Sequence, residues 1–270
     1  MEQLAALRLQ IEWGADEALE EAPVDRLRRV APQSQPSPAV AGTGVPPPLP
    51  QERRKVGEAA PPTSSTPAER AIQAAAAANT LDELRAAITA FDGCALHDTA
   101  SNLVFAAGDP AASLLLIGDP PSADDDRSGT PFSGAAGNYL DRMLASISLN
   151  REQLLLTPLI PWRPPGDRPP NPAELTLCLP FVRRLIALTA PRRLLIMGPL
   201  AARSLLPQTA ARRRQRGDWI DIAVPGLSHP IPALPTFSPV ELMRSPKDRR
   251  AAWADLRLLR RTLDADAASA

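Results

Sequence analysis

Acidic side chains concentrate in a stretch that follows the short apolar run at residues 113–118. Asp119 comes directly after Gly118 and before two prolines, and three more aspartates stand side by side at residues 124–126. A carboxylate in such a loop can position a water molecule or stabilise a positive charge, and it can equally cap a turn beside the prolines. Three adjacent carboxylates do not converge on one metal ion, so we expect this run to form a solvated face or a helix start.

The thiols and imidazoles of the chain are few: Cys94, Cys178, His97 and His229. Two thiols are too few for a self-contained tetrahedral metal site or a disulfide-rich secreted scaffold. We therefore expect two small buried cysteines in a reducing compartment, the cytoplasm. His97 is expected to be structural, whereas His229 lies near enough in sequence to the last polar loop to take part in chemistry.

Basic residues gather in several polar stretches. The chain has 30 Lys plus Arg against 30 Asp plus Glu, which excludes a globally basic nucleic-acid coat but permits a local phosphate-binding patch. A solvated charge run is the ordinary alternative, but several runs on neighbouring loops favour a DNA groove. The residues expected to face phosphates are Arg163, Arg168, Arg212, Arg213, Arg214, Arg216, Arg244, Lys247 and Arg249.

Short apolar runs alternate with helical patterns and must position these loops. The runs are 113–118, 153–158, 193–198 and 234–237, and the helical patterns include 80–91 with Thr80 as N-cap, 138–147 and 173–188. Strands that are apolar on both faces and alternate with helices indicate a mainly parallel sheet covered on both sides. We expect a three-layer α/β/α sandwich with a four-stranded central sheet. Chemistry then collects at the carboxyl ends of its strands, where the polar loops lie.

The chain divides into three parts by composition. Residues 1–22 suit an isolated amphipathic helix, and residues 23–67 form a linker whose segment 31–67 holds ten prolines. Residues 68–265 form the folded domain. The linker is either a plain spacer or the tether of a helix that docks on a protein partner. The acidic N-terminus does not suit a signal peptide, and no stretch approaches the length of a membrane span.

The loops, in this order and spacing, resemble the uracil-DNA glycosylase superfamily, and most closely its family 4. Five fragments carry the resemblance: CALHDTASNLVFAAGDP (94–110), IGDPPSADDDRSGTPFSGAAGNYLDRML (117–144), WRPPGDRPPNPAEL from Trp162, RRQRGDW (213–219) and TFSPVELMRSPKDRRAAWADL (236–256). The resemblance implies the same α/β/α fold and the hydrolysis of an N-glycosidic bond in DNA, with the nucleotide flipped into a pocket.

The resemblance assigns roles in the first two loops. Asp119, with Gly118 and Pro121, matches a G-E-A-P-G motif whose acidic residue positions water or stabilises the sugar cation, and here the acid is shorter by one methylene. Phe132 matches the aromatic residue on which the flipped base stacks, although it could also be a core residue below the loop. Pro158 stands where the family has an Asn that reads the pyrimidine edge, and a proline has no side-chain amide.

The last loop departs from the family in one residue. The family motif resembles H-P-A-x-L-L, whose His supports charge on the departing base, and Ser238 stands in its place. A serine hydroxyl donates one hydrogen bond but carries no charge, so slow catalysis or none is expected. Leu242 and Met243 could wedge into the duplex, or they could pack the start of a helix.

A further departure concerns iron. The family binds a [4Fe-4S] cluster through four cysteines, and the matching positions here are Phe91, Cys94, Trp162 and Cys178. Two thiolates cannot hold a cluster that needs four, and the two aromatic side chains indicate apolar packing instead. We expect no cluster and no other metal.

These features predict a DNA-repair glycosylase that acts on uracil or a related deaminated base, with weakened activity and no cofactor. Asp119 would orient water, Phe132 would stack the base, and Ser238 or a backbone amide would bind its carbonyl. The alternative is a catalytically inactive DNA-binding or protein-docking module on the same fold. Hydrolysis of a free nucleotide or nucleoside is a third hypothesis, against which the basic loops and the Leu242–Met243 wedge argue.

Overall fold

The computed structural model describes residues 65–209 and 216–269. The isolated helix predicted at residues 1–22 and the linker, except for its last three residues, lie outside this part of the chain. The first described helix, α2 (Pro67–Ala77), begins behind Thr66, whose hydroxyl accepts a hydrogen bond from the Glu69 backbone N–H while the Glu69 carboxylate accepts one from the Thr66 N–H. This capping box satisfies N–H groups that the first turn leaves unpaired.

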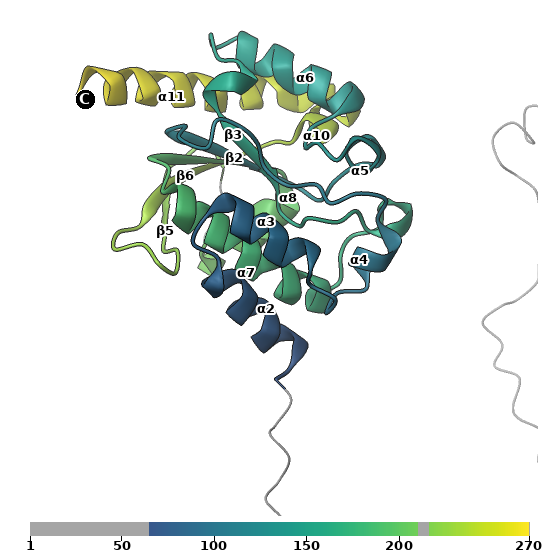
Figure 1. Cartoon of the computed structure of the whole chain (residues 1–270). Coiled ribbons are helices and arrows are strands. Elements are labelled where there is room, and N and C mark those ends of the chain that lie inside the picture. The colour runs from purple at the N-terminus through teal and green to yellow at the C-terminus, as the bar shows by residue number, and fades with distance from the viewer. Residues whose placement is uncertain (1–64, 210–215, 270) are drawn as a thin grey trace, which may run out of the picture. The chain divides into compact units, whose positions relative to one another are not determined.

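The central sheet has six strands in the order β1-β3-β2-β4-β6-β5 (Figure 1). The strands are β1 (Ala107–Gly108), β2 (Leu114–Gly118), β3 (Leu155–Pro158), β4 (Arg193–Met197), β5 (Ile220–Ile222) and β6 (Ile231–Thr236). Strands β3, β2, β4 and β6 are parallel, whereas β1 and β5 are antiparallel edges. The prediction of four strands was therefore incomplete, because the two edge strands have only two and three residues and no long apolar run.

Helices cover both faces of the sheet (Figure 1). The layer below the sheet in that view contains α2, α3 (Leu81–Thr89) and α7 (Pro172–Thr189), and the layer above it contains α6 (Gly134–Ala145) and α11 (Arg249–Ala268). The shorter helices α5 (Ala123–Ser128), α8 (Pro199–Leu205) and α10 (Pro239–Arg244) follow strands, and α4 (Leu96–Thr99) follows α3. Single turns lie at Arg151–Gln153, Pro165–Asp167 and Pro246–Asp248.

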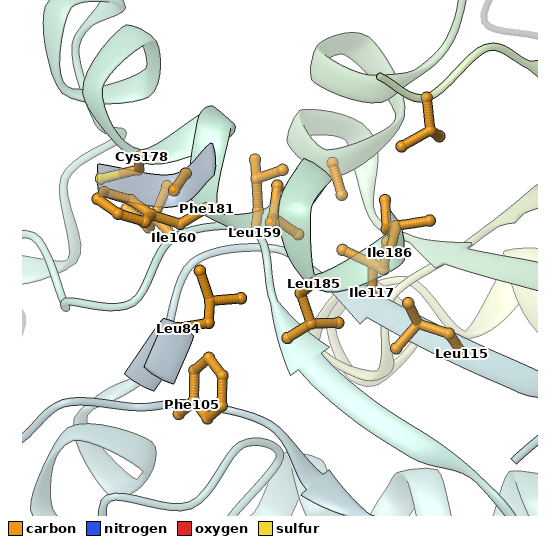
Figure 2. Close-up of a cluster of buried hydrophobic side chains, with 14 of the residues drawn as sticks. Leu84, Phe105, Leu115, Ile117, Leu159, Ile160, Cys178, Phe181, Leu185 and Ile186 are labelled. Atoms are coloured by element: carbon orange, nitrogen blue, oxygen red, sulfur yellow. The ribbon is translucent and has the colours of Figure 1, made fainter. Parts of the chain in front are cut away.

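Side chains of β2 alternate between two cores. Leu115 and Ile117 belong to the core shared with α2, α3 and α7, and Leu114 and Leu116 belong to the core shared with α6 and α11. Figure 2 shows part of the first core. A strand apolar at every position is thus buried on both faces, as a parallel sheet between helical layers requires. No helix of the described residues is long and apolar enough to cross a membrane.

Local signals set the longer helices. Thr80 caps α3 as predicted, because its hydroxyl accepts the Glu83 N–H at 3.1 Å. Asn171 caps α7 in the same way, with Pro172 at the first helical position. The helix predicted at 138–147 begins four residues earlier, at Gly134, because Ser133 stands in extended geometry before it.

Candidate active site

A cavity of about 440 Å³ opens where the four parallel strands end. Residues within two positions of the ends of β2, β4 and β6 line it, together with the last residue of β3. Because these ends meet at one edge of the sheet, loops distant in sequence converge on one space. The predicted site residues that line the cavity are Asp119, Pro121, Phe132, Pro158, Arg168, Ser238 and Arg244.

The carboxylate of Asp119 is anchored at the first turn of α8. Its Oδ1 accepts hydrogen bonds from the backbone N–H groups of Leu200 at 3.1 Å and Ala201 at 2.9 Å. Gly198 lies against the same carboxylate, and a Cβ at Gly198 would stand 2.3 Å from Oδ2. Since Gly198 also has a φ of 111°, only glycine fits between β4 and the acid.

Burial raises the pKa of the Asp119 carboxyl from 3.8 to about 6. The Ala201 and Leu200 N–H groups oppose this shift because they stabilise the charged form, whereas the nearby Glu241 carboxylate adds to it. The positive charge of Arg203 lowers the pKa again. A desolvated carboxylate that titrates near neutral pH can accept a proton from water, and its charge acts strongly in a low-dielectric cavity.

Phe132 forms the aromatic wall of the cavity. Its backbone is left-handed, with φ of 56°, and its carbonyl accepts a hydrogen bond from Arg151 Nη2 at 2.7 Å. The ring lies over Gly118, where a Cβ would stand 2.4 Å from its Cζ. The ring is half-buried: one part lines the cavity, and another packs against the core shared with α6 and α11, so part of the core alternative holds. Stacking of a base on this ring stays a prediction.

The carboxylates of Asp124, Asp125 and Asp126 bind three different sets of partners. The Asp125 carboxylate accepts hydrogen bonds from the Ser122 backbone at 2.8 Å and the Ser133 backbone at 2.5 Å, and so holds the loop that carries Phe132. Asp126 accepts the Ser101 N–H at 2.8 Å, and Asp124 forms an exposed pair with Arg127 at 2.9 Å. The run is the start of α5, as the sequence suggested, and each carboxylate has its own partner.

Pro158 ends β3 and lies beside Gly118 in the sheet. The Gly118 carbonyl accepts the Leu159 N–H at 2.8 Å, so the backbone at this end of the cavity is paired. Pro158 contributes ring carbons and its carbonyl, and it leaves no side-chain amide at this position to read a base edge.

Ser238 is a buried N-cap of α10. Its hydroxyl accepts the Glu241 N–H at 3.2 Å, and its own N–H donates to Glu241 Oε2 at 2.8 Å. The hydroxyl proton is not used by these bonds and can donate into the cavity. The Ser-x-x-Glu spacing is a capping-box signal, which would have identified Glu241 as a second carboxylate of the site.

The two residues proposed as a wedge have different surroundings. Leu242 is buried in the core beneath α6 and α11, so for this residue the packing alternative describes what the structure shows. Met243 is 43% exposed and Val240 is 38% exposed. Val240 and Met243 are three residues apart and so lie on the same side of α10, away from the buried Leu242. Insertion of a side chain of α10 into a duplex stays a prediction.

The predicted basic residues do not form one cluster. Arg244 and Arg168 line the cavity, and the Arg168 guanidinium is paired with the Glu174 carboxylate at 2.6 Å. Arg163 pairs with Asp167 at 2.7 Å, and Arg216 donates to the buried Asp255 at 3.1 Å. Arg212, Arg213 and Arg214 lie outside the described residues. Arg203, on the exposed side of α8, also lines the cavity, and the sequence reasoning missed it because it stands alone in an alanine- and leucine-rich helix.

His229 cannot replace the missing histidine of the last loop. It is exposed and precedes β6, whereas the cavity lies where β6 ends. A six-residue strand separates the two, so nearness in sequence does not bring this imidazole to the site.

The four positions that match cluster ligands lie in the core shared with α2, α3 and α7, and Cys178 belongs to α7 itself. Phe91, Cys94, Trp162 and Cys178 are all at least 95% buried. The Phe91 ring packs edge-on against Phe181 with centroids 5.4 Å apart, and Trp162 packs against His97 at 5.5 Å. Two thiols flanked by two packed aromatic rings do not provide the four soft ligands that an iron-sulfur cluster needs. The absence of a cluster stays a prediction.

The two thiols interact with each other. A hydrogen bond from Cys178 lowers the pKa of Cys94 to about 7, and the same bond together with burial raises the pKa of Cys178. Both cysteines are free and buried. This placement agrees with their expected role as small core residues.

Comparison with known proteins identifies relatives over this domain. Residues 105–257 match the family model described as the uracil DNA glycosylase superfamily. A type-4 uracil-DNA glycosylase of Pyrobaculum aerophilum is 30% identical over 178 residues, which cover 65% of this chain and 91% of that protein. One from Archaeoglobus fulgidus is 37% identical over 122 residues, 45% of this chain and 61% of that protein. One from Thermotoga maritima is 28% identical over 153 residues, 56% and 77% of the two chains.

Proposed function

The chain belongs to the uracil DNA glycosylase superfamily, and from this premise we propose that it hydrolyses the N-glycosidic bond of uracil, or of a related deaminated base, in DNA. The main support for the proposal is the buried Asp119 carboxylate, which lies in a cavity with an aromatic wall. Arg203 and Arg244 also line this cavity, and neither pairs with a carboxylate of the described residues. A cavity of about 440 Å³ suits a single flipped nucleotide.

The reaction creates a positive charge on the sugar and a negative charge on the base, and the cavity has a group that can stabilise each of them. As the bond breaks, its electron pair leaves with the base, and the sugar becomes an oxocarbenium ion. The Asp119 carboxylate stabilises that cation and accepts a proton from the water that attacks the anomeric carbon. The Ser238 hydroxyl donates to the base anion, and Phe132 stacks on its ring. The products are free base and an abasic site.

We propose that the reaction is slow. The Asp119 Oδ1 is already bound to two backbone N–H groups, which reduces the negative charge available to the sugar. A neutral hydroxyl at position 238 stabilises the departing anion less than an imidazolium does, and loss of such a donor commonly costs about 2.7–4 kcal/mol of the barrier. Because the Ser238 hydroxyl still donates a hydrogen bond, the slowing relative to a charged donor is at most about 10²–10³-fold.

The alternative function is a catalytically inactive DNA-binding or protein-docking module. Two observations favour it: Ser238 already serves as a helix cap, and Pro158 offers no base-reading amide. Binding of DNA without cleavage, whatever the base, would identify this alternative. Docking through the residues before the domain, and localisation in the cytoplasm, stay predictions.

The test is a single-turnover assay with enzyme in excess, on single-stranded and duplex oligonucleotides that carry one uracil. Alkaline cleavage then detects abasic sites. The matched variants are Asp119→Asn and Asp92→Asn, because Asp92 is an exposed aspartate paired with Arg70 outside the cavity. We expect cleavage by the wild type and Asp92→Asn, and loss of cleavage in Asp119→Asn. Binding without cleavage by the wild type would refute the proposed activity.

A further inference from the structure

Helix α11 carries arginines along its outward side that the cavity does not use. Arg249, Arg250, Arg257 and Arg261 are exposed, and none of them pairs with a carboxylate of the described residues. The three aspartates of the helix are engaged elsewhere: Asp255 with Arg216, Asp264 with Arg260 and Asp266 with Arg193. The outward side of α11 therefore keeps a net positive charge.

These arginines fall on one side of the helix because of their spacing. Arg249, Trp253, Arg257 and Arg261 are four residues apart, and Arg250 lies between them on the same side. The opposite side is buried, through Ala252, Asp255, Leu256 and Leu259. At 1.5 Å per residue, Arg249 and Arg261 are about 18 Å apart along the axis, which equals the rise of about five base pairs.

Aromatic rings accompany the charges at the start of the helix. The guanidinium groups of Arg142 and Arg249 lie 5.3 Å and 5.8 Å from the centroid of the Tyr139 ring of α6. Trp253 is 42% exposed beside them. A groove of about 360 Å³ is lined by these four residues. The exposed Trp253 and the half-buried Tyr139 thus lie among arginines, an arrangement typical of nucleic-acid surfaces, where aromatic rings contact bases or sugars.

This surface is continuous with the cavity. Leu242 of α10 lines the groove, while its neighbours Glu241 and Arg244 line the cavity. In Figure 1 α11 lies beside α6 on the same face of the sheet, begins near α10 and runs to the C-terminus. DNA whose flipped nucleotide entered the cavity would thus have a positively charged path leading away from it.

We propose that this arginine face, formed by Arg142, Arg249, Arg250, Arg257 and Arg261 with Tyr139 and Trp253, binds the phosphodiester backbone of DNA on one side of the flipped nucleotide. The inference rests on the proposed function, because it takes DNA as the substrate of the cavity. A linear polyanion fits better than a folded acidic protein, since positive charges recur at each helical turn over about 18 Å. Duplex DNA that follows the helix from the cavity has to extend at least about five base pairs beyond the lesion to reach Arg261.

The test compares two variants of the full chain that lose equal charge. Arg257→Gln/Arg261→Gln removes two arginines of the arginine face, and Arg85→Gln/Arg183→Gln removes two exposed arginines of α3 and α7, on the other layer of the sandwich. The measured quantity is the Kd for a fluorescent duplex with one uracil, over a range of salt concentrations. We expect about tenfold weaker binding for the first variant only, and a salt slope smaller by about 1.8.

The dependence of binding on the length of duplex beside the uracil is a second readout, and a general loss of charge would not change it. Shortening the duplex to about three base pairs on one side of the uracil should weaken wild-type binding to the level of the arginine-face variant. The same shortening should leave that variant almost unchanged. A third readout is a DNA-dependent change in tryptophan fluorescence that Trp253→Phe abolishes.

The outcomes separate the two proposals. If the wild type binds and cleaves uracil DNA but both double variants bind it equally well, the arginine face does not contact DNA and only this inference fails. Equal sensitivity of the wild type and the arginine-face variant to flank length would overturn it as well. If the wild type does not bind DNA at all, the proposed function fails together with the inference.

Discussion

Replacing Asp119 with asparagine should make the protein more stable above neutral pH while it abolishes cleavage. Burial raises the pKa of this carboxyl from 3.8 to about 6, so the folded state holds its proton more tightly than the unfolded state. Stability therefore falls as pH rises from about 4 to about 6, and the loss is complete at higher pH. A shift of this size corresponds to about 3 kcal/mol of unfolding free energy.

The asparagine removes the titrating group and keeps an oxygen that can accept the N–H groups of Leu200 and Ala201. The variant should therefore lack this fall in stability. The assay is urea denaturation of both proteins at about pH 4.5 and pH 8, with the difference in unfolding free energy compared between the two pH values. Asp92→Asn, at an exposed ion pair, is the control.

We expect the stability of Asp119→Asn relative to the wild type to increase by up to about 3 kcal/mol between the two pH values. Glu241→Gln provides a second check, because the negative charge of Glu241 contributes to the raised pKa of Asp119. In the Glu241→Gln background, replacing Asp119 with asparagine should therefore change the pH dependence of stability by less than it does in the wild type. A relative stability that does not change with pH would refute the reasoning, since it would mean that the carboxylate is not desolvated in the folded state.

Three further predictions follow from the site and its surroundings. Phe132→Leu removes the aromatic face but keeps an apolar side chain, so preference for uracil DNA over undamaged DNA, measured as a ratio of Kd values, should fall by about tenfold or more; an unchanged ratio would show that no base stacks there. Leu242→Ala should lower the unfolding free energy by about 2–5 kcal/mol, because Leu242 is buried. Met243→Ala should change the unfolding free energy by less than about 0.5 kcal/mol and should weaken DNA binding, because Met243 is exposed. A destabilised Met243→Ala, or a Leu242→Ala that weakens DNA binding without loss of stability, would contradict the assignment of the wedge. Elemental analysis of the purified protein should find no stoichiometric iron, because two thiols and two packed aromatic rings occupy the ligand positions. Stoichiometric iron together with visible absorbance would refute this prediction.

The sequence was sufficient to predict the central part of the fold. Strands such as β2 are apolar at every position, and helix starts such as Thr80 carry a capping residue, so periodicity and capping identified them. The edge strands β1 and β5 were missed because two or three residues carry no periodic signal. Their pairing depends on neighbouring strands, which a local pattern does not describe.

The site was predictable where loops leave the parallel strands, and less so elsewhere. Asp119, Phe132 and Ser238 converge because parallel strands end at one edge, a rule that applies without coordinates. The burial of Leu242 and the pairing of Arg216 with Asp255 depend on how α10 and α11 pack, and residue type alone did not reveal them. Glu241 could have been found from its capping-box spacing with Ser238.

The measurement that most directly tests the central claim is the release of free uracil by the wild type and Asp119→Asn, measured by mass spectrometry under single-turnover conditions between about pH 5 and pH 8. Because the ionised carboxylate stabilises the sugar cation, wild-type release should rise with pH through about 6 and then reach a plateau. The Asp119→Asn variant should release no uracil at any of these pH values. Equal release by both proteins would contradict the role of Asp119, and DNA binding without release by the wild type would contradict the assignment as a glycosylase.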